Sequence, residues 1–498
     1  MDTILFLVIV GFIHLSFYFF NTIFVSCMHL PYLVLLENIG IDIQFLRIKW
    51  FTTAFNRSLM KWGLNRSKFW AAWFNTGMIV TLLLLPISII LLLKMTFEAF
   101  VKENSVDPNE IGSGETLEIM IPGVTIPFSE IGYYIIALLL SSSVHEFGHA
   151  MAAVKEDVRF LGTGMIIFFI LPVAYVNICD SGLSMLGHKS RLRILCAGIW
   201  HNVILTGLAM MIAGLITISL KPFFIQNTGV YIKHIYPNSG LLGPVGLSNG
   251  DVVHKINDCS VHDSTSWRYC IQQAIQLSTP GYCVNDNIVR KSDKSSFLQN
   301  DANDMHNCCD KHYKNNGHLC FEHLGIIDMQ APHSSSVNFC LPIRTIISSS
   351  HNYCQSNDHC SMASDYCVKP TVTNSTKVVQ IQRYGGKDVI FHGNPLEIYY
   401  TIELSDWVPR YSFFSPQLPE VLILLCKYVA LFSSGIAIVN VIPCFFFDGQ
   451  HIISILIDQR LKNTVKEQSI RSVIAFVVMT VFSILLIGNV FIILFNKL

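Results

Sequence analysis

Two histidines and a glutamate, His145, Glu146 and His149, are spaced as HExxH in this chain. On a helix, histidines four positions apart lie on one face and can bind one zinc ion, while the glutamate can act as a general base on water. The flanking stretches, 131–144 and 150–154, hold no charged residue. The pattern therefore predicts a hydrolytic site with one Zn²⁺ ion inside a membrane-spanning helix.

A carboxylate far along the chain could complete such a site. Asp448 is the only acidic residue between Glu420 and Asp458, in the run NVIPCFFFDGQH that begins at Asn440. A lone carboxylate in a membrane helix requires a partner, and a cation bound by two histidines would supply one. His451 is an alternative third ligand, but an unpaired carboxylate is costlier to bury than a neutral histidine. Two histidines and Asp448 would leave the fourth zinc position open, as hydrolysis requires.

The composition indicates a polytopic membrane protein. The chain has 498 residues, of which 51% are hydrophobic and only 14% are charged. Its net charge of +0 gives no indication of a nucleic-acid partner. Six charge-poor runs are long enough to cross a bilayer: Thr3 to about Cys27, Phe69 to Leu93, Ile131 to Val154, Ile194 to Leu220, Val421 to Ile457 and Ser472 to Phe495.

Two further apolar features affect the count of crossings. The first run continues from Thr3 to Leu36 without a basic leader, so we expect an anchor rather than a cleaved signal. A seventh run, Phe160 to Cys179, contains glycines and a proline and follows the third crossing with almost no loop. We expect this run to be re-entrant or packed against the membrane core, and a seventh crossing is the alternative.

Basic residues indicate the orientation. The segment 38–68 is rich in lysine and arginine, as are the segments before the fourth and sixth crossings, which predicts that all three face the cytosol. The acidic segment 96–130 and the region between the fourth and fifth crossings then face the lumen. In that region Asn374 starts an Asn-Ser-Thr triplet, a candidate glycosylation acceptor.

The region between the fourth and fifth crossings is long enough for a separate domain. Short β-branched runs such as Val252–Ile256, broken by Gly-Asp turns, predict a small β-rich fold similar to PDZ domains, which bind extended peptides. Ten of the fifteen cysteines fall between Cys259 and Cys367. An even, dense cluster predicts disulfides in an oxidising lumen, and a reduced, zinc-binding loop is the alternative.

These motifs together resemble the site-2 proteases, a family of intramembrane zinc metalloproteases. HExxH and the pattern NxxPxxxxDG at Asn440 to Gly449 are the two family signatures, here each in a membrane segment with a PDZ-like region between them. The cysteine-rich insertion and the run GIWHN at 198–202 are similar to the animal members. Phe447, where many members have leucine, is the one departure.

The resemblance implies roles for particular residues. His145, His149 and Asp448 would bind one zinc ion, and Glu146 would be the base. Asn202 and Asn440 would lie near the site as candidate contacts to the substrate or the developing oxyanion. Hydrogen bonding between helices is an equally good explanation for the two asparagines.

The resemblance also implies the substrate and the compartment. Family substrates are type II or hairpin membrane-anchored transcription factor precursors, of the sterol regulatory element-binding and stress-response types, already cut once in the lumen. The partner would then be a transmembrane helix in the lipid bilayer, cut toward the cytosolic face in the Golgi or the endoplasmic reticulum. A helix hides its amides, so the substrate must unwind. The segment Thr116 to Phe128 is a candidate luminal hairpin that presents an edge strand.

Other functions remain as alternatives. Membrane zinc proteases that cut prenylated proteins also carry HExxH but typically take a glutamate as third ligand. A zinc transporter would need no general base at Glu146, and a catalytically dead scaffold would be expected to lack a ligand or the base.

The expected fold is a polytopic α-helical membrane protein with about six transmembrane helices and a luminal PDZ-like domain. The expected regions are a two-helix membrane region with a cytosolic loop (1–95), a luminal hairpin segment (96–130), the HExxH membrane core (131–220), the PDZ-like domain with its cysteine-rich insertion (221–415, the insertion about 283–367) and the membrane core with the Asp-Gly motif (416–498).

Overall fold

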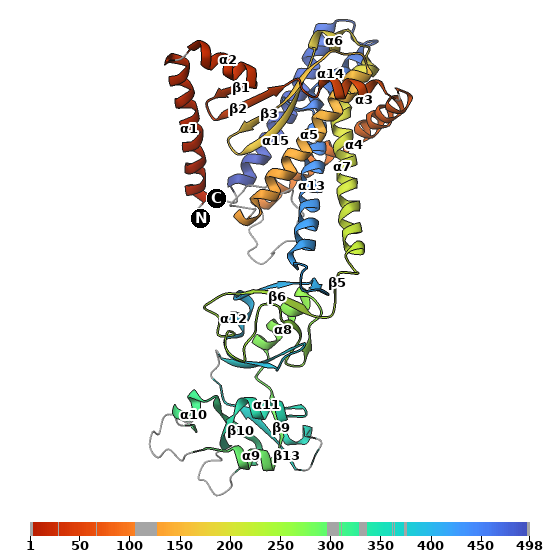
Figure 1. Ribbon diagram of the computed structural model, residues 1–498. Helices are drawn as coiled ribbons and strands as arrows, with labels where there is room; N and C mark the ends of the chain where they lie inside the picture. Colours follow the sequence, from red (N-terminus) through yellow and green to blue (C-terminus); the bar gives the residue numbers. More distant parts are fainter. Residues whose placement is uncertain are drawn as a thin grey trace. The chain divides into compact units, whose positions relative to one another are not determined.

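The computed structural model describes residues 3–27, 29–65, 67–104, 127–295, 308–309, 311–327, 336–360, 362, 364–372 and 376–495 (Figure 1). The chain forms two compact units. The first comprises Met1–Ile216 and Val421–Leu498, and the second comprises Thr217–Glu420. The candidate hairpin at 116–128, apart from Pro127 and Phe128, and the glycosylation acceptor Asn374 lie outside the described residues.

Within the described part of the chain, six helices are long and apolar enough to cross a membrane, which confirms the predicted number. These helices are α1 (Thr3–Cys27), α4 (Ser67–Asn104), α5 (Ile131–Lys155), α7 (His188–Ser219), α13 (Gln417–Val441) and α15 (Gln468–Phe495). The remaining helices of the first unit are shorter: α2 (His29–Ile39), α3 (Asn56–Leu64), the 3₁₀ turn η1 (Phe128–Glu130), α6 (Asp180–Met185) and α14 (Asp448–Leu461).

The fifth charge-poor run, Val421 to Ile457, forms two helices instead of one. The helix α13 ends at Val441, and α14 begins at Asp448. Pro443 lies in the break, where its missing N–H and its ring prevent the helix from continuing. Phe446 adopts a positive φ of 71° there, which a helix excludes. The break makes Asp448 the first residue of a new helix.

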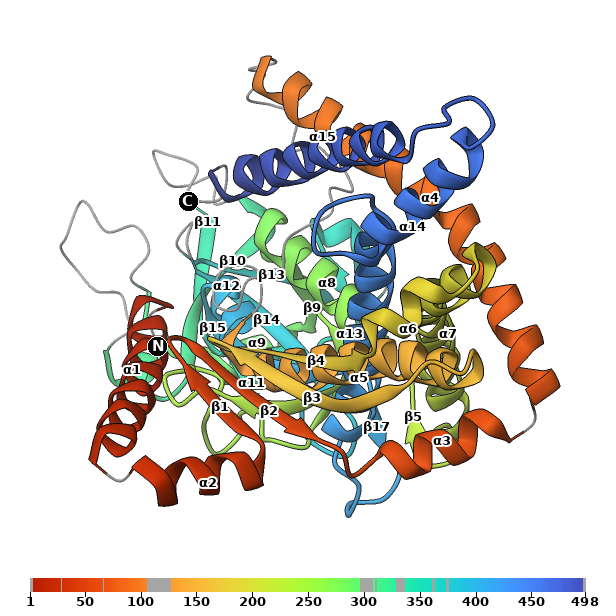
Figure 2. The ribbon, with the colours of Figure 1, turned by 90° about the horizontal axis from the view of Figure 1, so that it is seen from above.

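The seventh apolar run forms two strands that pack against the helix α5, and it is not among the helices long enough to cross a membrane. The strands β3 (Phe160–Phe168) and β4 (Leu171–Ile178) make an antiparallel hairpin that packs on α5 (Figure 2). The predicted cytosolic segment adds β1 (Ile41–Gln44) and β2 (Arg47–Thr52), so that the sheet has the order β1-β2-β3-β4. β4 is therefore an edge strand, and α5 lies beside it.

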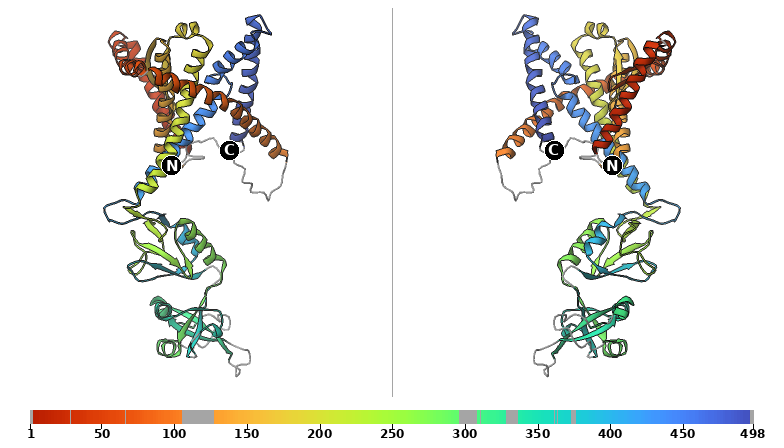
Figure 3. Two further views of the ribbon diagram at one scale, coloured as in Figure 1. Left: turned by 90° about the vertical axis from the view of Figure 1, so that its right-hand side faces the viewer. Right: turned by 90° about the vertical axis from the view of Figure 1, so that its left-hand side faces the viewer.

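The second unit contains two β folds (Figure 3). The first has strands in the order β15-β14-β7-β6-β16, with β8 paired to β7, around a core that includes Trp267. The helix α8 begins with a capping box, in which Asp263 accepts from the Ser266 N–H. Its elements are β5 (Phe224–Ile225), β6 (Val230–Ile235), β7 (Val252–Ile256), β8 (Cys259–Ser260), α8 (Ser264–Gln276), β14 (Lys377–Arg383), β15 (Val389–Gly393), α12 (Pro395–Tyr400), β16 (Ile402–Ser405) and β17 (Val408–Pro409).

The second β fold is inserted between α8 and β14, and its sheet has the order β11-β10-β13-β9-β12. All ten cysteines of the cluster form disulfides, which confirms the predicted framework: Cys259–Cys270, Cys283–Cys360, Cys308–Cys320, Cys309–Cys340 and Cys354–Cys367. Its elements are β9 (Gly281–Asn285), α9 (Asp286–Ser292), α10 (Lys311–Asn315), β10 (His318–Ile327), β11 (Ser336–Pro342), α11 (Ile343–Ser349), β12 (Tyr353–Cys354), η2 (Asn357–His359) and β13 (Asp365–Pro370).

The two β folds contact each other directly. Val378 on β14 is buried in the core of the inserted fold, next to residues such as Phe321. The Tyr353 hydroxyl donates to Gln380 Oε1 at 2.8 Å, and Arg344 donates to the Asp388 carbonyl at 2.9 Å. The polar bonds and the shared apolar contact hold the two folds together.

Candidate metal centre

Three side chains from distant parts of the chain converge in the first unit. His145 Nε2 lies 3.0 Å and His149 Nε2 3.2 Å from Asp448 Oδ2, and the two nitrogens are 3.1 Å apart. Zinc–ligand bonds of about 2.0 Å in a tetrahedron place neighbouring ligand atoms roughly 3.3 Å apart. The three atoms therefore have the separation that one tetrahedral zinc ion requires.

The local sequence explains how these ligands are positioned. His145 and His149 are one helical turn apart on α5 and are both buried. Asp448 starts α14 directly after the break, and a carboxylate is favourable at a helix N-terminus because of the helix dipole. A Cβ on Gly449 would lie 2.1 Å from the Ile442 carbonyl oxygen, so only glycine lets the break fold back this tightly.

Helix α7 packs directly against the ligand pair. A Cβ on Gly198 would lie 2.4 Å from His149 Nε2, and a Cβ on Gly148 would lie 2.6 Å from the Ala197 carbonyl oxygen. Small residues allow membrane helices to approach this closely. The glycine at 198 thus removes the side chain that would occupy the position of the ligand atoms.

Both histidines have hydrogen-bond partners on the nitrogen that faces away from the ligand cluster. His149 Nδ1 donates to the Ile194 carbonyl at 2.8 Å. The Asn202 side-chain amide is 3.2 Å from His145 Nδ1, and Asn202 Oδ1 has no partner among the described residues. With the amide oxygen and nitrogen exchanged, Oδ1 accepts from the His145 Nδ1–H and satisfies both groups. Both Nε2 atoms are then free of protons and can bind a metal.

Glu146 points toward the sheet edge next to α5. Its carboxylate accepts a hydrogen bond from the Val176 backbone and interacts electrostatically with His145, His149 and Asp448. One turn earlier on α5, Ser142 Oγ accepts from the Ala174 N–H at 3.2 Å. The outward N–H groups of the edge strand β4 therefore face the helix that carries the HExxH motif.

Of the other candidate residues, Asn202 contacts the ligand His145, while His451 bonds elsewhere. The His451 ring pairs with the adjacent Gln450 side chain at 2.8 Å and is exposed, so it does not belong to the cluster. Asn440 is half-buried in the last turn of α13, while Asn202 is fully buried on α7. Gly198, which packs on the histidines, was not identified as part of the site from the sequence, because its contact depends on how two distant helices cross.

Two comparisons with known proteins cover the part of the chain that contains these residues. The model of peptidase family M50 matches residues 133–486. A protein of Arabidopsis thaliana described as a membrane-bound transcription factor site-2 protease homolog is 23% identical over 445 residues, which cover 80% of this chain and 83% of that protein. The family match spans both α5 and α14, the helices that carry the three converging ligands.

Proposed function

The chain belongs to peptidase family M50, as a membrane metalloprotease of the site-2 protease type, and on that basis we propose that it cuts membrane-anchored transcription factor precursors within a transmembrane segment. Each precursor has already been cut once in the lumen, and the second cut releases its cytosolic domain. Precursors of the sterol regulatory element-binding and stress-response types are the expected substrates.

The observation that supports this function most is the convergence of His145, His149 and Asp448 within 3.2 Å beside Glu146. These three side chains would hold one Zn²⁺ ion. When bound, zinc acts as a Lewis acid that lowers the pKa of water and polarises a carbonyl. A transporter site would need no general base, whereas Glu146 lies next to the ligands.

We assign the proton transfers to Glu146. Its carboxylate takes a proton from the attacking water and delivers it to the amide nitrogen that leaves, so that one peptide bond gives a carboxylate and an amine. Asn202 orients the His145 ring through Nδ1. Asn440 is a candidate contact to the substrate backbone or the oxyanion.

The edge strand β4 offers a way to hold an unwound substrate. Among the described residues, its outward N–H groups at Ala174 and Val176 are bonded to side chains of α5. An extended substrate segment could pair with this edge next to Glu146.

The basic residues of the membrane unit support a cytosolic position for the sheet β1-β2-β3-β4. They support the same side for the ends of α5 and α14 that carry the three ligands. The five disulfides of the second unit support a luminal position for it. We propose the Golgi, or the endoplasmic reticulum, as the compartment.

A cell reporter tests the function. A sterol-regulated precursor, already cut in the lumen, is followed for release of its soluble domain in cells that lack their own enzyme. We expect release with the parent chain and with His451→Ala, but not with Glu146→Gln or Asp448→Asn. Loss of a general base should lower the rate by about 10³-fold.

His451→Ala is the matched control, because His451 lies three positions from Asp448 on the same helix but outside the cluster. Release that persists with Glu146→Gln would exclude the proposed mechanism. Metal measured on the purified variants separates the roles, since Glu146→Gln should retain zinc and Asp448→Asn should lose it.

A further inference from the structure

A cleft of about 1320 Å³ lies between the two β folds of the second unit. It is lined by the β7–β8 region (255–259), the chain from the end of α8 to Tyr282, part of β14 (377–382) and the segment 350–355. Pockets for small molecules usually measure about 300–1,000 Å³. The size of this cleft therefore suits a length of polymer chain better than a small molecule.

Two hydroxyl groups that line the cleft have no hydrogen-bond partner within the described part of the chain. Tyr282 and Thr279 are 1% and 5% exposed, and neither the Tyr282 hydroxyl nor Thr279 Oγ1 is bonded. Buried polar groups are nearly always hydrogen-bonded, so two orphans at one cleft point to a missing partner. Burial raises the pKa of Tyr282, so its hydroxyl keeps its proton and can donate to an acceptor.

The charge around the cleft favours an anionic ligand. Among the described residues that line it, Asp258 is the one acid, and it pairs with Lys255 at 3.0 Å. Lys369 and Lys377 add two positive charges, and neither forms an ion pair among the described residues. The net charge of the lining is therefore positive.

The cleft also offers backbone edges to an extended chain. β12 is the last strand of its sheet and lines the cleft, as does β8, which pairs only with β7. Extended peptides bind such edges through main-chain hydrogen bonds, and basic groups nearby can hold a terminal carboxylate.

We propose that this cleft binds the luminal end of a substrate that has already been cut once, with its new terminal carboxylate facing Lys369 and Lys377. The inference rests on the proposed function. In a type II precursor the cytosolic domain precedes the transmembrane helix, so a luminal cut leaves a remnant that ends in a free carboxylate. An uncut luminal domain has no such end at this position. The cleft would thus favour precursors that are ready for the second cut.

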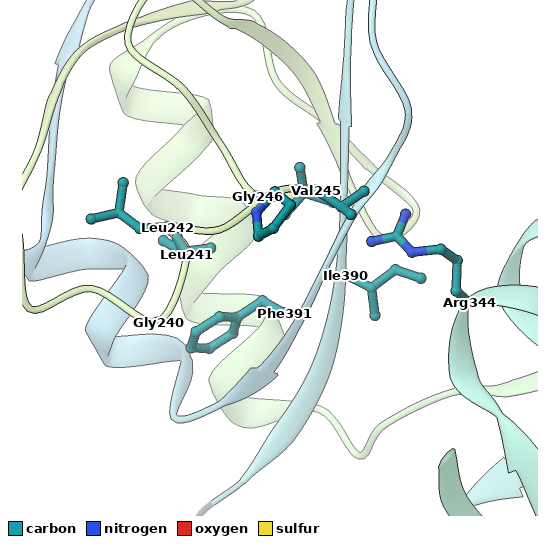
Figure 4. A pocket seen from close by; sticks show the side chains of 10 residues that line it. Gly240, Leu241, Leu242, Val245, Gly246, Arg344, Ile390 and Phe391 are labelled. Atoms are coloured by element: carbon teal, nitrogen blue, oxygen red, sulfur yellow. The ribbon is translucent and has the colours of Figure 1, made fainter. Parts of the chain in front are cut away.

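A second pocket in this unit is a weaker candidate (Figure 4). It measures about 230 Å³ and is lined by the loop 240–246, by Phe391 and by Arg344. The Arg344 guanidinium already donates to the Asp388 carbonyl at 2.9 Å. The pocket is smaller than the usual ligand site, and none of its lining residues has an orphaned buried group among the described residues.

Direct binding tests the proposal without relying on proteolysis. The probe is a fluorescein-labelled decapeptide of Ser, Thr, Val and Leu with a free terminal carboxylate, and its partner is the purified full chain with Glu146→Gln, followed by fluorescence anisotropy. We expect the C-terminally amidated probe to bind at least about tenfold more weakly, since charge-assisted hydrogen bonds are lost. Equal binding of the two probes, or no binding of either, would overturn the proposal.

Variants of the chain localise the binding. Lys369→Gln with Lys377→Gln should weaken the carboxylate probe about tenfold, and Tyr282→Phe about fivefold, without affecting the amidated probe. Lys387→Gln is the matched control, because Lys387 is an exposed lysine of the same unit that does not line the cleft. If Lys387→Gln weakened binding of the carboxylate probe as much as the double variant, the probe would bind elsewhere and the cleft would be rejected.

Cleavage distinguishes the two proposals from each other. Two substrates share one transmembrane segment, and only one carries a ten-residue luminal tail. The double lysine variant should raise KM for the tailed substrate about tenfold, with kcat unchanged and no effect on the tail-less substrate. Cleavage of both substrates with no difference between variants would reject the cleft and keep the protease. If the parent cuts neither substrate, the protease function fails, and the anisotropy result still decides the cleft.

Discussion

The two units of this protein hold their structures by different means. The five unpaired cysteines among the described residues, Cys27, Cys179, Cys196, Cys426 and Cys444, all belong to the membrane unit. The ten cysteines of the second unit are all in disulfides. The membrane unit instead relies on close helix contacts at glycines and on a few polar bonds, such as Ser141 with Ser433. Covalent links stabilise a small β fold, whereas close packing of helices positions the metal ligands.

The largest expected effect comes from breaking a disulfide of the second unit. The bond Cys283–Cys360 closes a chain separation of 77 residues. Its removal by Cys283→Ala with Cys360→Ala should cost about 4.5 kcal/mol of unfolding free energy, by the loop-entropy relation. Limited proteolysis of the purified chain should show faster cutting within 281–370 and unchanged zinc content. Cys179→Ala, which removes an unpaired thiol, is the control, and equal destabilisation by it would contradict the comparison.

In the membrane unit, the largest loss of zinc affinity should come from a single methyl group added at Gly198. Gly198→Ala places a carbon 2.4 Å from His149 Nε2, so the ligand must move. We expect zinc affinity to fall by about 100-fold, measured by competition with a chelating dye. Gly207→Ala on the same helix is the matched control, since no atom lies within 4 Å of its added carbon. Equal zinc affinity of the two variants would show that α7 does not constrain the ligands.

Removal of the hydrogen bond between Asn202 and His145 should lower zinc affinity by a smaller factor. Asn202→Ala leaves His145 Nδ1 without a partner, which should lower zinc affinity about tenfold. Asn440→Ala should leave zinc affinity unchanged and lower the rate of cleavage, if Asn440 contacts the substrate. The two variants therefore separate orientation of a ligand from contact with the substrate. An unchanged cleavage rate for Asn440→Ala would assign Asn440 to helix packing alone.

The smallest expected effect is the pH dependence of the second unit. His323 is 2% exposed, packs on Tyr366 with ring centres 4.7 Å apart, and has a pKa lowered by burial from its ordinary 6.5. The unfolded chain then binds more protons than the folded one, so stability is complete above about pH 6.5 and decreases as the pH falls below it. Thermal unfolding between pH 7.5 and 5.5 should show a slope that His323→Phe reduces.

His234→Gln is the control for this slope, because His234 is an exposed histidine of the same unit. A slope that His323→Phe leaves unchanged, or one that His234→Gln reduces equally, would contradict the assignment to His323.

The sequence predicts the ligand set better than the elements that hold it. His145 and His149 share a helix face by periodicity alone, and Asp448 is the one carboxylate in its run, so both could be found without a fold. The break between α13 and α14 could not be specified from the sequence, because a proline in an apolar run can either kink a helix or end it. The strands β3 and β4 were not predicted, since a short apolar run without alternation gives no clear period.

Other features depend on distant contacts and could not be read from the chain. The presence of disulfides followed from an even number of clustered cysteines, but ten cysteines do not specify their pairing. The contact of Gly198 with His149 depends on how α5 and α7 cross. The cleft likewise exists only because the inserted fold packs on β14, which brings Tyr282 and Lys377 into one lining.

The chain enters and leaves the inserted fold at two neighbouring points of the first β fold. The Lys377 ammonium donates to the Leu277 carbonyl at 3.2 Å, so the two junctions of the insertion are adjacent although 100 positions separate them in sequence. A short glycine linker could therefore replace the insertion without stretching the strands of the host, which is how domains are exchanged in modular proteins. On β14, Val378 is the buried apolar residue that packs against the insertion, so removing the insertion would expose it. Replacing Val378 with a polar residue would then give a shortened protein without an exposed apolar side chain at that position.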